Sequence, residues 1–192
     1  MQNSSRLRRT VPLAAVLLGI LAMLAVATPA HATTYWTVPA VLKSFFAQSK
    51  KVTHRRVTLS EEGATALAAK LGAPLGKNEW VVYVGETDGR TDGYAIVDAE
   101  KGMHELIDFA VRFSPTGAVE RVEVLEYREP YGDEVRRERF RAQFSGKTAA
   151  DPLTVGQDID IVSGASISSR SMAVGIKRDA LVLAEALKSG AL

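Results

Sequence analysis

The segment that most restricts the fold lies in the middle of the chain, where residues 106–113 alternate between apolar and other side chains. The apolar positions are Ile107, Phe109, Val111 and Phe113. A period of two puts these side chains on one face of a β-strand. Residues 114–117, Ser-Pro-Thr-Gly, fit a type I turn with proline second and glycine fourth, and they lead into a second strand over residues 118–127. The sequence therefore predicts a hairpin within an antiparallel sheet.

Other stretches supply more strands and a set of helices. Strands are expected over residues 79–85, where Trp80, Val82 and Val84 share a face, and over residues 94–97. Helices are expected at residues 36–48, at residues 60–71, from Asp133 through Phe144, and at residues 168–188. The basic run at residues 50–56 indicates a solvated linker or the edge of a strand. The fold class that follows is α+β, with an antiparallel sheet packed by helices.

The ten residues before and into the last predicted helix read Asp-Ile-Val-Ser-Gly-Ala-Ser-Ile-Ser-Ser, at positions 160–169. A helix start offers unpaired backbone N–H groups and a partial positive charge, so it stabilises a phosphate held at a nearby hydroxyl. Ser166 is the candidate hydroxyl, while Gly164 lets the backbone turn closely and Ala165 leaves room beside it. The same residues also fit an ordinary turn and helix cap, in which Asp160 is only a solvent-facing acid.

The first 32 residues have the features of a secretory signal. Three arginines precede 17 uncharged residues at positions 11–27, and the small residues Ala30 and Ala32 fit cleavage after Ala32. A run of this length is also at the lower limit for a spanning helix, so an uncleaved anchor is the alternative. We therefore predict export to the periplasm or to the outer face of the cytoplasmic membrane. Residues 33–90 are expected to supply helices and the first strands, and residues 91–192 a binding domain, in one compact unit.

Composition narrows the function of the exported part. The signal holds three arginines and no acid, so 21 of the 24 basic residues remain beside all 22 acidic ones. A near-neutral domain lacks the positive surface that nucleic-acid binding requires, and we predict no nucleic-acid partner. The absence of cysteine excludes disulfides, thiolate-bound iron–sulfur clusters and Cys-x-x-Cys-His haem attachment. With only His54 and His104 left, no histidine-rich metal site is expected.

The region from about residue 94 to residue 187 resembles the FMN-binding domain of the G subunit of Rnf-type electron transport complexes and of the C subunit of sodium-translocating NADH:quinone reductases. Three blocks carry the resemblance: residues 93–113, residues 119–144 with Leu-Glu-Tyr-Arg-Glu-Pro-Tyr-Gly at 125–132, and residues 160–169. The resemblance implies that a flavin transferase joins FMN through its phosphate to Ser166, in a magnesium-dependent reaction outside the cytoplasm. The family more often has threonine at that position and Glu-Thr-Pro-Gly-Leu-Gly in the central segment.

The resemblance also implies a set of FMN-binding residues. Ser166 is the attachment point, and the other members are Asp160, Ser163, Gly164, Ala165, Ser168 and Ser169, with Glu129, Tyr131, Gly132 and Tyr94 from the central segment and the sheet. His104 is either a flavin neighbour or an exposed residue at the start of a strand.

The predicted function is electron transfer. No Ser-His-Asp set or suitably placed acidic pair points to an independent catalytic site, so we predict a redox carrier rather than an enzyme. Its partners would be the flavin transferase and either redox proteins or a membrane electron-transport complex. Two alternatives remain, an FMN-dependent reductase and a flavin-free binding module of the cell envelope.

Overall fold

The computed structural model describes residues 32–192, so the predicted signal lies almost entirely outside the described residues. Their centre is a six-stranded antiparallel sheet with the strand order β1-β6-β5-β4-β3-β2. The strands are β1 (Thr33–Thr34), β2 (Lys51–Thr58), β3 (Glu79–Thr87), β4 (Arg90–Lys101), β5 (Leu106–Phe113) and β6 (Val119–Tyr127). The strands from residues 33–90 and those from the rest of the chain thus share one sheet.

The hairpin of β5 and β6 forms where the alternation predicted it. Val111 lies opposite Val122, and the turn closes with a hydrogen bond of 3.0 Å from the Gly117 N–H to the Ser114 carbonyl. Ile107, Phe109, Val111 and Phe113 are all fully buried. Their burial follows from the two-residue period, because all four side chains point to the face of the sheet that carries the larger core, while the intervening side chains point to the other face.

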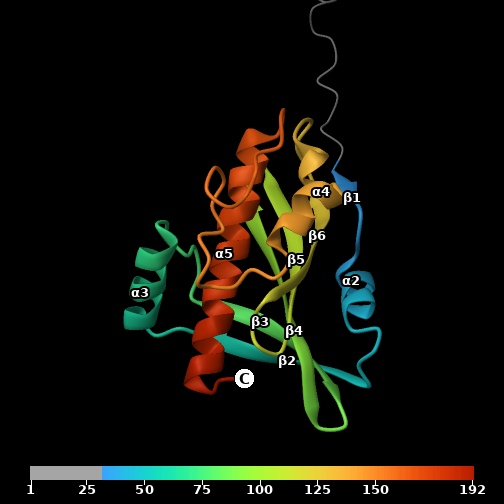
Figure 1. The fold of residues 1–192 in the computed structure, drawn as a ribbon, viewed down its shortest axis with the longest axis vertical. Helices are drawn as coiled ribbons and strands as arrows, with labels where there is room; N and C mark the ends of the chain where they lie inside the picture. Colours follow the sequence, from blue (N-terminus) through green and yellow to red (C-terminus); the bar gives the residue numbers. More distant parts are fainter. Residues whose placement is uncertain (1–31) are drawn as a thin grey trace, which may run out of the picture.

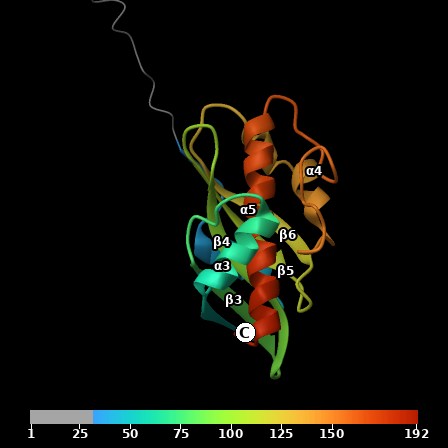
Figure 2. The ribbon, with the colours of Figure 1, turned by 90° about the vertical axis from the view of Figure 1, so that its left-hand side faces the viewer.

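Helices cover the two faces of the sheet unequally (Figures 1 and 2). The long helix α5 (Ser166–Ser189) and the shorter α3 (Glu61–Leu71) lie on one face, and α2 (Val38–Phe45) lies on the other. The larger core lies under α5 and α3, whereas α2 packs Val41 and Phe45 onto small side chains such as Ala95 and Ala110. These elements confirm the predicted α+β class.

One local prediction was wrong, and two others become more definite in the structure. The helix expected from Asp133 is broken into η1 (Asp133–Arg136), α4 (Glu138–Arg141) and η2 (Ala142–Phe144), because Arg137 is extended. Phe140 and Phe144 are nevertheless buried and meet edge to face at 5.4 Å. The basic run at residues 50–56 falls mainly in β2, at the edge of the sheet, and the last helix begins two residues before Ser168.

Within residues 32–192, no helix combines the length and the apolar character needed to cross a membrane.

Candidate functional site

Ser166 is the first residue of α5, the most deeply anchored helix of the described chain. Met172, Ile176 and Leu183 on this helix are fully buried against the sheet. The Ser171 hydroxyl also donates a hydrogen bond of 2.7 Å to the carbonyl of Lys101, at the end of β4. Ser166 therefore lies on a rigid element, at the end of the molecule where α4 also lies (Figure 1).

The loop before α5 is held in place without capping the helix. Gly164 has a φ of +83°, a left-handed conformation that favours glycine, and Ala165 behind it is buried. The Ser169 hydroxyl accepts a bond of 3.2 Å from the Val162 N–H and donates one of 2.8 Å to the Ala165 carbonyl. Ala165 stands in the cap position, and no side chain caps the helix. The N–H groups of the first turn are thus left for another acceptor.

A cavity of about 430 Å³ opens beside Ser166, and we call it the Ser166 groove. Three segments line it: Met103 and His104, residues 129–132, and residues 164–168. Several of the lining side chains are apolar and exposed, with Met103 57% exposed, Tyr131 82% and Ile167 45%. Large apolar side chains gathered around a cavity are typical of a ligand site or an interface.

Two buried hydroxyls join the α5 wall of the groove to the wall formed by residues 129–132. Tyr127, at the end of β6, donates a hydrogen bond of 2.5 Å to the Tyr131 carbonyl, and its oxygen lies 2.8 Å from the Ser168 hydroxyl. Burial raises the pKa of Tyr127, although the Ser168 hydrogen bond opposes this effect. A Cβ on Gly132 would lie 2.5 Å from the Tyr127 oxygen and 2.6 Å from that of Ser168. Glycine is therefore required there.

Glu129 holds in place the segment of the groove that contains Met103 and His104. Its carboxylate accepts bonds of 2.7 Å from the His104 N–H and 3.1 Å from the Glu105 N–H. A Cβ on Gly102 would lie 2.4 Å from the same carboxylate, so this turn also packs closely against it. His104 is exposed and lines the groove. Glu129 is thus engaged in holding the turn that carries Met103 and His104.

Not every predicted site residue reaches the groove. Asp160 and Ser163 line a second cavity of about 430 Å³ that also involves Arg137 and Arg139. The Asp160 backbone is clamped by Gln143, which accepts a bond of 2.6 Å from its N–H. Ser169 is buried in the first turn of α5, and Tyr94 is buried in the core opposite Phe113. The structure therefore brings Ser166, Gly164, Ala165, Ser168, Glu129, Tyr131 and Gly132 together, and not the other four.

Sequence reasoning did not single out Tyr127, Met103 or Ile167. Ile167 stood inside the motif, so its place next to Ser166 was a usable signal. Tyr127 and Ser168 are 41 positions apart, and only the fold brings them together.

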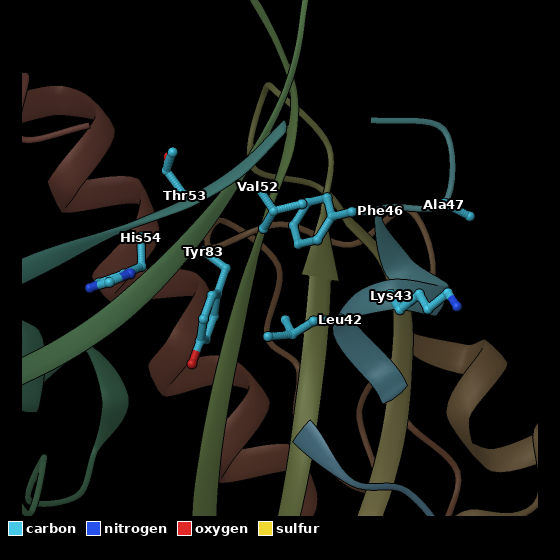
Figure 3. Close-up of a pocket in the computed structure, with 8 residues that line it drawn as sticks. All are labelled: Leu42, Lys43, Phe46, Ala47, Val52, Thr53, His54 and Tyr83. Atoms are coloured by element: carbon cyan, nitrogen blue, oxygen red, sulfur yellow. The ribbon is translucent and has the colours of Figure 1, made fainter. Parts of the chain in front are cut away.

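A larger cavity, of about 520 Å³, lies elsewhere, between the end of α2 and the strands β2 and β3 (Figure 3). Figure 3 shows Phe46 beside Val52, with Leu42 and Tyr83 nearby. None of the residues of the 160–169 motif lines it. Size alone therefore does not identify the site.

Comparisons with known proteins agree with this geometry. A sequence model of the family described as FMN-binding domain matches residues 102–180, which include all three segments of the Ser166 groove. The crystal structure of Shewanella oneidensis NqrC superposes with a TM-score of 0.52 and 18% identity, covering 77% of this chain and 88% of that chain. No curated protein sequence matches the chain significantly. Residues 102–180 thus match the model of the FMN-binding domain family, and the fold of the chain is like that of NqrC.

Proposed function

We propose that the chain is an exported electron-transfer protein that carries FMN covalently on the hydroxyl of Ser166. The observation that carries this proposal is the position of Ser166, at the start of an uncapped helix and beside an open apolar groove. A phosphodiester at Ser166 would accept hydrogen bonds from the first-turn N–H groups of α5. Ser166 supplies the same hydroxyl as the threonine that is more frequent in the family.

The groove also fits the flavin ring by size and chemistry. Its volume of about 430 Å³ lies within the range of roughly 300–1,000 Å³ that small-molecule sites occupy. Tyr131, Met103 and Ile167 offer apolar and aromatic surface for the ring, and Gly164 leaves the loop without a side chain beside Ser166. Bound FMN supplies one- or two-electron chemistry, while these residues position the ring and limit its contact with water.

The attachment reaction is assigned to a separate flavin transferase that uses FAD. The Ser166 oxygen forms a bond to the flavin-side phosphorus, the phosphoanhydride bond of FAD breaks, and AMP leaves. The hydroxyl proton passes to a base of the transferase. Among residues 32–192, no group of three or more His, Cys, Asp or Glu side chains is placed to hold a metal ion, so the proposal takes the magnesium ligands from the transferase.

Asp160, which lines the second cavity together with Ser163, has a different role in this proposal. The Asp160 carboxylate is exposed and makes no hydrogen bond or ion pair within the described residues. This carboxylate is available to contact the transferase while Ser166 reacts. Asp160 therefore serves the attachment step, whereas the Ser166 groove serves the attached flavin.

The location and the partners complete the proposal. The first 32 residues direct the chain out of the cytoplasm, to the compartment in which the transferase acts. An open groove leaves the flavin close to the surface, where a redox protein or a membrane electron-transport complex can exchange electrons with it.

Intact-mass measurement after co-expression with a flavin transferase tests the proposal. The natural chain should gain the mass of FMN minus one water, and Ser166→Ala should gain nothing. Ser163→Ala is the matched control, because it removes a hydroxyl from the same loop but from outside the groove, and it should still be modified. An adduct that persists in Ser166→Ala, or a natural chain without any adduct, would contradict covalent attachment at Ser166.

A further inference from the structure

The hydroxyls of Tyr127 and Ser168 form two consecutive hydrogen bonds beneath the groove, and the donor of each bond can be assigned. Tyr127 is 2% exposed and Ser168 is 3% exposed. The Tyr131 carbonyl only accepts hydrogen bonds, so it takes the single phenolic proton of Tyr127. The Ser168 hydroxyl must then donate to the Tyr127 oxygen. The order of donation is Ser168 to Tyr127 to Tyr131, and it links the first turn of α5 with residues 129–132.

Residues 129–132, which form this wall of the groove, are packed tightly against the two hydroxyls. Gly132 has a φ of +97°, and its backbone fits so closely over the two hydroxyls that a Cβ would overlap both. The ring of Tyr131 projects into solvent at the rim of the groove, while its carbonyl is fixed from below. The buried hydroxyls therefore hold the backbone from which this exposed ring projects.

We propose that Tyr127 is a positioning residue of the flavin site, which fixes the Tyr131 wall against the helix turn that carries Ser166 and so sets how far the flavin is shielded from solvent. This inference rests on the proposed function for its flavin part and on the hydrogen bonds for its structural part. The phenolic proton of Tyr127 is committed to a carbonyl and its pKa is raised by burial, so Tyr127 acts through the wall and not by proton transfer.

Hydrogen exchange of the unmodified chain tests the structural part. Tyr127→Phe removes one oxygen and keeps the ring in the core. We expect faster amide exchange confined to residues 128–132 and 166–169, with the strand β5 unchanged. Tyr83→Phe is the matched control, because the Tyr83 hydroxyl makes no hydrogen bond within residues 32–192 and lies at the cavity of Figure 3. Unchanged exchange in Tyr127→Phe, or an equal rise throughout β5, would overturn the proposal.

Collisional quenching of the bound flavin by iodide tests the flavin part. After loading by the transferase, Tyr127→Phe should raise the quenching constant about twofold or more, since one hydrogen bond that keeps the wall closed is lost. Ser168→Ala should give the same rise, and the double variant should add little, as expected for one shared interaction. A merely stabilising role for Tyr127 would lower the unfolding temperature and leave quenching unchanged.

The possible failures are distinguishable. A natural chain that takes up no FMN refutes the proposed function, and hydrogen exchange of the unmodified chain still decides whether Tyr127 holds the wall. A loaded Tyr127→Phe variant with natural quenching overturns the role of Tyr127 and leaves flavin attachment at Ser166 standing.

Discussion

At the scale of single residues, one buried carboxyl group far from the groove has a strongly shifted pKa. Asp179 is fully buried on α5, next to Asp98 of β4, and Arg178 pairs with Asp98 at 2.9 Å. Burial, and then the negative charge of Asp98, raise the pKa of Asp179 well above its ordinary value. Burial also acts on Asp98, but the hydrogen bond with Asp179 and the cations Arg178 and Lys77 together lower its pKa. Asp179 therefore keeps its proton to a higher pH than an ordinary aspartate, whereas Asp98 loses its proton more readily.

Replacing Asp179 with asparagine should change how stability depends on pH. A raised pKa in the folded state contributes stability that is complete below the unfolded value of about 4 and is lost as pH rises through the folded value. The free energy of unfolding of Asp179→Asn, minus that of the natural chain, should thus increase as pH rises from about 4, by about 1 kcal/mol or more. Urea unfolding at several pH values measures it. A difference that does not change with pH would refute the raised pKa of Asp179.

Gly132 occupies a position where a side chain would overlap its neighbours. Gly132→Ala places a Cβ against two buried hydroxyls in a left-handed backbone, so we expect a loss of about 1–3 kcal/mol of stability and poorer flavin loading. Gly146→Ala is the matched control, because Gly146 has a φ of +79° but nothing within 4 Å of an added Cβ. Its loss should be smaller, with loading unchanged. Equal effects of the two substitutions on loading would show that the contact with Tyr127 and Ser168 does not matter.

At the scale of elements, α5 packs closely on the sheet at Gly175. A Cβ there would lie 2.6 Å from the ring of Phe109, which is fully buried in β5. Gly175→Ala should therefore destabilise the fold by about 1–3 kcal/mol through overpacking, although alanine alone would favour the helix by about 1 kcal/mol. Thermal unfolding measures the net effect. A higher unfolding temperature would mean that helix and sheet can separate without loss.

The sequence predicted the elements whose signals are local. The alternation in β5 and the Ser60 cap of α3 each depend on neighbouring residues, and both appear in the structure. The region after Gly132 could not be predicted in the same way. Phe140 and Phe144 have helical spacing, but the extended Arg137 interrupts the helix.

The site was predictable only in part, because some of its contacts join residues that are far apart in the sequence. Ser166, Gly164 and Ala165 are neighbours in a motif, so the sequence already places them together. Tyr94 had a side chain suited to a flavin, yet a strand pattern tells which face a residue takes and not which end of the sheet it lies near. Tyr127 contributes to the groove through a partner on a distant helix, which no local pattern reveals.

At the scale of the whole molecule, the core and the groove are separate. The buried side chains of β5, β6 and α5 form one cluster, whereas the Ser166 hydroxyl lies outside it at the start of the helix. The chain should therefore fold before it receives FMN, and Ser166→Ala should change stability by no more than about 0.5 kcal/mol. This separation supports the proposed function, in which the transferase acts on the surface of the folded chain.

Fragmentation mass spectrometry of the flavin-bearing peptide tests the central claim most directly. Cleavage after Lys147 and Arg170 releases residues 148–170, a peptide that holds Ser163, Ser166, Ser168 and Ser169 together. After co-expression with a flavin transferase, we predict that the fragments place FMN on Ser166. Flavin on another of these serines, or a peptide without flavin from a fully folded chain, would contradict the account.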